Sequence, residues 1–434
     1  MHHQYFQHKQ ISVQVVIFVL HILAMKQFEI PEFYRSPIIS KVKAKRKLDD
    51  PRKKDFTPSV LNFGSLQILI ARHFGFCYGV ENAIEIAYKA INENPGKRIF
   101  LLSQMIHNPD VNADLLANGI QFIQDTDGTQ LISWDEITSE DIVIIPAFGT
   151  TLEIEAQLNE IGAQTEKYNT TCPFVEKVWN RSEKLGQDQH TVIIHGKYNH
   201  EETRATFSHS TANAPSLIIK DIEEARFLAA VIKGKQSQDD FYTFFDGKFS
   251  EGFDPNQHLS KIGVVNQTTM LATETQEITE YLRSVIEEKY GLENIKNHIA
   301  DTRDTLCYAT NDNQTSTLGL MEESADLAIV VGGYNSSNTT HLVELLEQKF
   351  TTLFIRSEHQ IGEEGSVNSF NIHQHVEERQ QNVLPLDASK PLKMIITSGA
   401  SCPDAVVDRV IQKIIALRQE EVSVDEALGQ FLLK

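Results

Sequence analysis

The sequence is poor in cysteine, with four in 434 residues and no CxxC pair. So few cysteines in a chain of this length do not make a disulfide framework, and the missing pair excludes a zinc ribbon and a thioredoxin-type motif. Positive charge is also scarce, because the chain has 40 Lys and Arg but 59 Asp and Glu, which gives a net charge of −19. That balance argues against a general binder of nucleic acid or of anionic membranes.

Long apolar runs are absent before residue 66 except at residues 11–24, which fall short of the ~20 residues that span a bilayer. Because Met25 follows this run, we expect residues 1–24 to come from a mis-called start codon, with a secretory or organelle-targeting segment as the alternative. Residues 1–65 are predicted to be a partly disordered extension, in which the basic stretch 41–54 is a solvated tail or clamp. The expected location is the cytoplasm, or a plastid-type organelle if residues 1–65 are a targeting segment.

From residue 66 onward, short apolar runs alternate with amphipathic helices. Such runs, rich in Val, Ile and Leu, are typical of parallel strands covered on both faces, so the predicted class is α/β. The expected strands are 67–71, 98–102, 141–147, 191–195, 216–220, 261–265, 326–332, 351–355 and 392–398. These strands with their helices are too many for one sheet. We therefore predict three lobes: 66–171, 172–303 with an insertion near 233–260, and 304–434 with the C-terminal tail.

Each of the four cysteines directly precedes a predicted helix. The positive end of a helix dipole lowers the pKa of a thiol, and the thiolate is the form that binds metal. Single cysteines in different lobes can meet only where the lobes meet. Three converging thiolates suit a 4Fe–4S cluster with one iron free of protein ligands, or an open zinc site. The alternative is four small residues of the core. The cysteines are Cys77, Cys172, Cys307 and Cys402.

Polar side chains follow several of the predicted strands. Open α/β sheets bind ligands beyond the carboxyl ends of their strands, and hydroxyls, amides and free N–H groups at helix N-termini form an anion site. With two histidines added, a phosphate or diphosphate is the expected ligand, although ordinary N-capping is the alternative for the Ser and Asn residues. The candidates are His107, Asn108, His200, Glu201, Glu202, Thr206, Gln267, Thr268, Thr269, Ser336, Ser337, Asn338 and Ser401.

Taken together, these motifs resemble one family, the 4-hydroxy-3-methylbut-2-enyl diphosphate reductases, also called IspH or LytB. They run in family order from about residue 66 to about residue 418. The variants PAFG and HGKYNHEET, and the insertion before NQTTM, resemble the plant and cyanobacterial branch. The matching motifs are FGFCYGVENAI, the HN at 107–108, TTCPFVEKV, HGKYNHEET, NQTTM, DTLCYAT, GGYNSSNTTHL and SGASCPD.

The resemblance implies a three-lobed trefoil of parallel-sheet α/β domains around a central 4Fe–4S cluster held by Cys77, Cys172 and Cys307. It implies reductive dehydroxylation of an allylic diphosphate to isopentenyl and dimethylallyl diphosphates, the last step of the non-mevalonate isoprenoid pathway. Glu202 matches the family's proton-relay glutamate, with Thr268 as a hydroxyl relay. The residues implied around the substrate are His107, His200, Thr268, Ser336, Ser337, Asn338 and Ser401.

Three residues and the electron donor carry separate expectations. Phe148 stands where the enterobacterial type has histidine, so the diphosphate pocket has one fewer imidazole. Cys402 is expected to be a structural thiol, and Glu201 a solvated or capping residue. No GxGxxG motif, the fingerprint of a dinucleotide-binding site, follows the strand at 67–71. The expected electron donor is therefore a small protein, reduced ferredoxin or flavodoxin, with the basic stretch 41–54 as its contact. No nucleic-acid or membrane partner is expected.

Two alternatives from other classes stay open at this point. One is a zinc hydrolase of a phosphorylated substrate that uses three thiolates and a bound water. The other is a secreted binding protein with its four cysteines paired as two disulfides.

Overall fold

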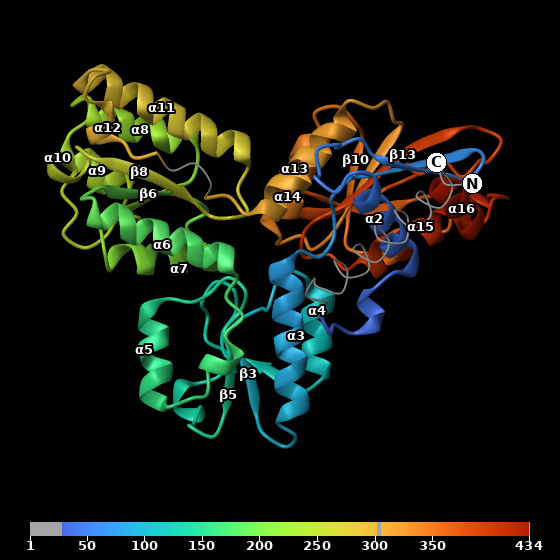
Figure 1. The fold of residues 1–434 in the computed structure, drawn as a ribbon, viewed down its shortest axis with the longest axis horizontal. Coiled ribbons are helices and arrows are strands. Elements are labelled where there is room, and N and C mark those ends of the chain that lie inside the picture. The colour runs from blue at the N-terminus through green and yellow to red at the C-terminus, as the bar shows by residue number, and fades with distance from the viewer. Residues whose placement is uncertain (1–27, 302–304, 434) are drawn as a thin grey trace, which may run out of the picture.

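Three lobes, each built on its own sheet, make up the computed structural model, which describes residues 28–301 and 305–433 (Figure 1). The strand orders are β4-β3-β5, β7-β6-β8 and β1-β2-β13-β9-β10, and a separate hairpin joins β11 to β12. All nine predicted strands are present in these residues, so the α/β class with parallel sheets is confirmed. Residues 1–24 lie outside the described residues. No helix in the described part of the chain is long and apolar enough to cross a membrane.

The first lobe has a parallel sheet of β4 (Ile120–Phe122), β3 (Ile99–Leu101) and β5 (Ile142–Ile144). Its helices are α3 (Tyr78–Glu93), α4 (Pro109–Ala117) and α5 (Leu152–Ile161), with two short 3-10 turns, η2 (Trp134–Glu136) and η3 (Glu166–Tyr168). The apolar residues of α3 recur at helical spacing, so Ala83, Ile84 and Ala87 form one buried face in the core with Ile99 and Leu101. This packing places the start of α3 at the centre of the molecule.

The second lobe has a parallel sheet of β7 (Ser216–Ile219), β6 (Thr191–His195) and β8 (Ile262–Asn266). The polar insertion predicted near 233–260 contains two short helices and contributes Phe241, Phe245 and Phe253 to the lobe's core. The helices are α6 (Pro173–Gln187), α7 (Glu201–Thr211), α8 (Ile222–Ile232), α9 (Gln238–Phe244), α10 (Pro255–His258), α11 (Ala272–Tyr290) and α12 (Ile295–His298).

The third lobe has five strands, of which only the edge strand β1 runs antiparallel. They are β1 (Ser59–Asn62), β2 (Leu66–Ile70), β13 (Leu392–Ser398), β9 (Leu327–Val331) and β10 (Thr352–Ile355). The hairpin consists of β11 (Val367–Asn371) and β12 (Val376–Gln380), and η4 is Glu358–Gln360. The helices are α13 (Tyr308–Met321), α14 (Ser337–Leu346), α15 (Asp404–Arg418) and α16 (Val424–Leu433).

The strand β2 corrects the predicted lobe boundary at residue 66. Residues 66–70 were expected in the first lobe, but they pair in parallel with β13 in the third. An apolar run predicts a buried strand without naming its neighbour, so the sequence alone did not reveal this pairing. From β2 the chain therefore leaves the third lobe and enters the first lobe just before Cys77.

The segment before β1 is also different from the prediction. Residues 37–49 form helix α2 (Pro37–Asp49), preceded by η1 (Glu32–Tyr34), and α2 buries Ile39 and Val42. Its N-cap Ser36 donates a hydrogen bond to Asp408 Oδ2 at 2.7 Å, and Lys43 Nζ lies 2.7 Å from Asp404 Oδ1. The solvated-tail prediction for 41–54 is therefore wrong for the part within α2, because apolar residues between the lysines give this helix a face to bury.

Candidate functional site

A cavity lies where the three lobes meet. Every residue predicted to hold metal, bind substrate or act in catalysis lines it. Its walls also include Phe148 and several residues that the sequence did not single out, among them Gly79 and Thr310. The predicted residues are Cys77, His107, Cys172, His200, Glu202, Thr268, Cys307, Ser336, Ser337, Asn338 and Ser401.

Three of the cysteines occupy equivalent positions, one on each lobe. Cys77, Cys172 and Cys307 are the N-cap residues of α3, α6 and α13. A Cβ atom at Gly79 would lie 2.7 Å from Sγ of Cys172 and 4.0 Å from Sγ of Cys77, so only glycine leaves room for these sulfurs. Cys402 is buried in the core of the third lobe and does not line the cavity.

The pKa values of these thiols differ from the prediction. Burial raises the pKa of Cys77 and Cys172 to about 12, and it also raises the pKa of Cys307. Backbone N–H groups at the helix starts, such as those of Gly79 and Val80, act in the opposite direction but do not outweigh burial. The expected fall of the thiol pKa is therefore not found, because burial disfavours the charged thiolate more than the N–H groups of the helix starts stabilise it.

Glu202 is buried at the start of α7 and faces Thr268 after β8. The N–H of Thr268 donates to Oε1 of Glu202 at 2.5 Å, and the Thr268 hydroxyl donates to Oε2 at 3.0 Å. Burial raises the pKa of Glu202 to about 7, although both hydrogen bonds from Thr268 act to lower it. The carboxyl group can therefore hold or release a proton near neutral pH.

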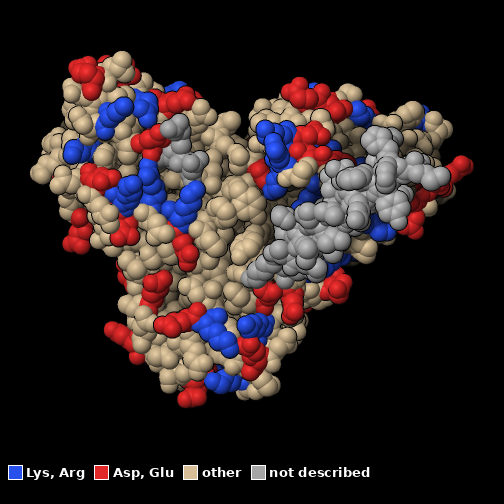
Figure 2. Space-filling model, in the orientation of Figure 1, with Lys and Arg blue, Asp and Glu red and all other residues tan. Residues whose placement is uncertain are grey.

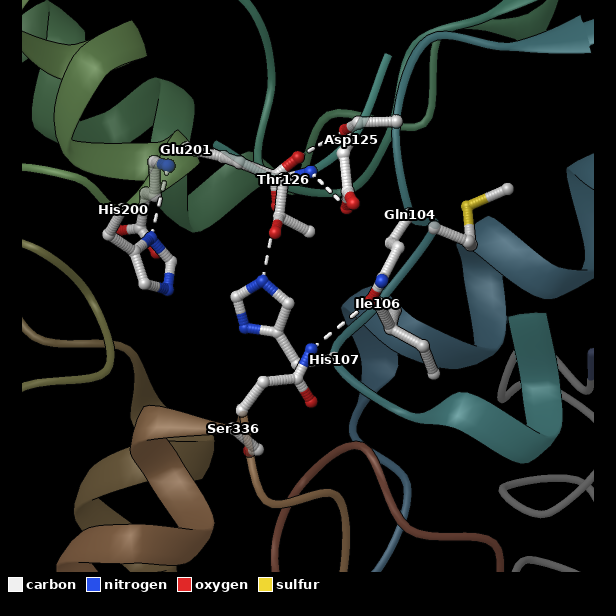
Figure 3. A network of polar contacts seen from close by, with 12 residues as sticks. Gln104, Ile106, His107, Asp125, Thr126, His200, Glu201 and Ser336 are labelled. Atoms are coloured by element: carbon white, nitrogen blue, oxygen red, sulfur yellow. Dashed lines mark hydrogen bonds and ion pairs between the residues drawn. The ribbon is translucent and has the colours of Figure 1, made fainter. Parts of the chain in front are cut away.

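Glu201 is not the solvated residue that was predicted. Only 7% of it is exposed, its Oε2 lies 3.1 Å from Nε2 of His107, and the hydroxyl of Ser103 donates to its Oε1. Figure 3 shows the side chains around His107, with His200 and Glu201 from α7 and Ser336 from the third lobe. The prediction failed because Ser103, the other partner, lies in a part of the sequence with no recognisable motif.

One ring nitrogen of His200 has no hydrogen-bond partner among the described residues. Its Nδ1 accepts the N–H of Glu202 at 3.1 Å, so the proton of the neutral ring is on Nε2. Burial lowers the pKa of His200 well below its usual range, and the charges of His107 and Lys197 act in the same direction. Nε2 is buried and has no hydrogen-bond partner among the described residues. A buried donor of this kind needs an acceptor from a ligand.

Phe148 packs against both histidines, whose rings also contact each other with centroids 4.9 Å apart. Its ring centroid is 4.4 Å from that of His107 and 5.5 Å from that of His200. It packs against both rings but donates no hydrogen bond, so the polar contacts at this end of the cavity come from the imidazoles and from the third lobe.

The third lobe contributes hydroxyls and an amide. Ser336 is the N-cap of α14 and accepts the N–H of Thr339, while Oδ1 of Asn338 accepts the N–H of Ala400 at 2.9 Å. The hydroxyl of Ser401 lies 3.4 Å from that of Ser336. These groups surround a helix N-terminus, which favours an anion.

Three further candidates hold the walls and do not line the cavity. Asn108 caps α4 and donates to the carbonyl of Ser401 at 2.9 Å. Thr206 accepts a hydrogen bond from Trp179, and Gln267 accepts one from Thr203. The sequence pattern therefore found residues in and around the cavity, but it did not separate those that line the cavity from those that hold its walls through hydrogen bonds.

The profile of the LytB protein family matches residues 68–415. The chain belongs to the LytB family. It is 41% identical over 361 residues to a 4-hydroxy-3-methylbut-2-enyl diphosphate reductase of Synechococcus sp. (strain WH7803), covering 83% of this chain and 88% of the relative.

Other similar proteins agree with this assignment. The reductase of Prochlorococcus marinus (strain AS9601) is 38% identical over 386 residues, covering 88% of this chain and 91% of the relative. A solved structure of the Plasmodium falciparum reductase of E-1-hydroxy-2-methyl-but-2-enyl-4-diphosphate superposes with a TM-score of 0.57 at 21% identity, covering 80% of this chain and 86% of that one. The first two relatives are cyanobacterial, as the branch-specific motifs indicated, and the structural match supports the LytB fold.

Proposed function

We propose that this protein catalyses the reductive dehydroxylation of (E)-4-hydroxy-3-methylbut-2-enyl diphosphate to isopentenyl and dimethylallyl diphosphates. The observation that carries the proposal is one cavity in which three thiols, a buried carboxyl group and an anion-type helix N-terminus meet. The relatives named above carry this reductase's name. The reaction needs each of these three elements, and no two lobes contain all of them.

The thiols of Cys77, Cys172 and Cys307 would hold a 4Fe–4S cluster. Among the described residues, no group of three or more His, Cys, Asp and Glu side chains is close enough to hold a single metal ion. Three thiols at the starts of helices on three different lobes suit a cluster, in which each thiolate binds a different iron. When bound, the cluster supplies electrons and a Lewis-acidic iron for the hydroxyl oxygen.

The diphosphate would bind at the third lobe. The hydroxyls of Ser336, Ser337 and Ser401 and the amide of Asn338 surround the start of α14, where free N–H groups favour negative charge. The buried Nε2–H of His200 is a further donor that lacks a protein partner. Fixing the diphosphate here sets which carbon of the allylic unit faces the thiols, which is a positioning effect.

Glu202 would provide the proton that lets the hydroxyl leave. Hydroxide is a poor leaving group, so the carbon–oxygen bond breaks with transfer of a proton, and the oxygen departs as water. Thr268 holds both carboxylate oxygens of Glu202 and relays the proton through its own hydroxyl. Two electrons enter the substrate, and a second proton binds either end of the allylic unit, which gives the two products.

The electrons would come from reduced ferredoxin or flavodoxin, with the basic stretch 41–54 as the contact. Several of its charges are already paired, including Lys43 with Asp404 and Lys53 with Asp312, whereas Lys41, Arg52 and Lys54 are exposed. Figure 2 shows Lys and Arg interspersed with Asp and Glu over the visible face. Replacing the three exposed residues by Glu should weaken turnover with the carrier and leave turnover with a small chemical reductant unchanged. Equal losses with both reductants would refute this contact.

The proposed activity is tested by anaerobic purification followed by iron and sulfide analysis. About four iron and four sulfide per chain, with a broad visible absorption band, is the expected result. Turnover of the allylic diphosphate with a chemical reductant should then release both products. Zinc without sulfide, or a cluster without turnover, would refute the proposal. A cytoplasmic location is proposed with the activity.

A further inference from the structure

The pair formed by Glu201 and His107 has no part in the chemistry proposed so far. The two residues come from different lobes, since His107 follows β3 and Glu201 starts α7. Both are at least nine-tenths buried, and Nε2 of His107 lies 3.1 Å from Oε2 of Glu201. The other oxygen of Glu201 accepts the hydroxyl of Ser103, so the carboxylate is held from two sides by the first lobe.

The rest of His107 is fixed by the third lobe and by Phe148. The hydroxyl of Ser401 donates to the carbonyl of His107 at 3.2 Å, and a Cβ atom at Gly333 would lie 2.5 Å from that carbonyl. The ring packs on Phe148 with centroids 4.4 Å apart and planes 31° apart. Glu201 is thus the one charged group among the contacts that fix this imidazole in the described residues.

We propose that Glu201 is a positioning residue for the diphosphate: its carboxylate holds Nε2 of His107 and so fixes the ring with its other edge directed to the phosphate oxygens. Nε2 is occupied by Glu201, so Nδ1 is the nitrogen left for a ligand in the cavity that His107 lines.

The two histidines of the cavity then differ in how their rings are held. His200 is neutral, because burial lowers its pKa and its Nδ1 accepts the N–H of Glu202. His107 is the imidazole with a carboxylate partner. Phe148 packs against both rings and donates nothing, so the imidazole contact to the diphosphate that a carboxylate holds in place falls to His107, supported by Glu201.

This inference rests on the proposed function, and its test measures binding of isopentenyl diphosphate to the iron-loaded protein by anaerobic titration calorimetry. Glu201→Leu should weaken binding about tenfold or more, the usual effect of losing a charge-assisted hydrogen bond. Glu201→Gln keeps the shape and a carbonyl acceptor but loses the charge, and it should show a smaller loss. If Glu201→Leu fails to fold, Glu201→Gln still tests the charge.

A double-mutant cycle separates positioning from a general structural effect. If Glu201 acts through His107, the variant with both Glu201→Gln and His107→Ala should bind no more weakly than His107→Ala alone. The matched control is Glu155→Gln, because Glu155 lies 3.9 Å from Nε2 of His209 on α7 but neither residue lines the cavity. That variant should bind as the unaltered protein does.

The outcomes are distinct. Unchanged affinity in both Glu201 variants, or losses that add in the cycle, would overturn the inference while leaving the proposed function intact. Absence of diphosphate binding by the unaltered, iron-loaded protein would instead overturn the proposed function.

Discussion

Glu201 and Glu202 are neighbours in the sequence, yet their carboxylates have partners on different lobes. Glu201 pairs with His107 of the first lobe, and Glu202 accepts two hydrogen bonds from Thr268 of the second. Both lie in the first turn of α7, where successive side chains point in different directions. In the proposed function, one helix start therefore supplies a group that supports binding and a group for proton transfer.

Replacing Glu202 by Gln should lower kcat at least 100-fold, because an amide cannot supply the proton that lets water leave. Binding of isopentenyl diphosphate should change little, since Glu202 faces Thr268 and not the helix start of the third lobe. Steady-state kinetics and calorimetry measure the two effects. Glu183→Gln, an exposed residue of α6, is the control. A large loss of affinity with unchanged kcat would contradict the assignment.

The rate should depend on the protonation of Glu202. Burial raises its pKa to about 7, so the acid form is dominant below that pH and is lost as the pH rises above it. We expect kcat to fall as the pH rises from 7 to 9. The Thr268 hydroxyl favours the charged carboxylate, so Thr268→Val should raise the pKa and move the inflection to higher pH. A shift to lower pH would show that another group controls the rate.

Gly79→Ala should prevent cluster binding without unfolding the protein. The added Cβ would lie 2.7 Å from Sγ of Cys172, which must then move. Iron and sulfide per chain should fall to a small fraction of the unaltered value, while far-UV circular dichroism stays the same. Gly429→Ala in α16 is the matched control, since nothing lies within 4 Å of its Cβ position. Full iron content in Gly79→Ala would mean that Cys172 is not a ligand.

Helix α2 should contribute to stability as part of the third lobe. Ile39 is fully buried against this lobe's core, so Ile39→Ala is expected to lower the free energy of unfolding by about 2–5 kcal/mol. Denaturant titration checks the value. Phe33→Ala is the comparison, because Phe33 is 55% exposed and should cost much less. Equal effects of the two substitutions would mean that α2 is not packed as described.

The sequence predicted the positions of individual strands better than it predicted which strands lie side by side. Apolar runs such as Thr191–His195 are long and regular, so their strands were found with correct bounds. The strands β1, β4, β11 and β12 were missed: β1 lies in the segment expected to be an extension, β4 has only three residues, and β12 consists mainly of charged and polar ones. The pairing of β2 with β13 was missed because alternation and length say nothing about which strand lies alongside.

The site was predicted from side-chain chemistry at strand and helix ends. Cysteines before helices, and the Ser and Asn residues that start α14, stand out because such positions are repeated in the chain. The contact between Glu201 and Ser103 was missed, because nothing in the pattern of the sequence repeats it. Their contact joins residues of two lobes, and a buried carboxylate next to a catalytic one looks in sequence like an ordinary acidic residue in the first turn of a helix.

The pairing of β2 with β13 has a consequence for the order of events during synthesis. The sheet that positions the entry into Cys77 needs a strand from near the C-terminus, and Ser401 follows that same strand. Until the ribosome has released the last part of the chain, this sheet lacks a central member and one wall of the cavity does not exist. In the proposed function, the cavity that would hold the cluster is therefore complete only after residues 392–401 have been made and β13 has paired with β2.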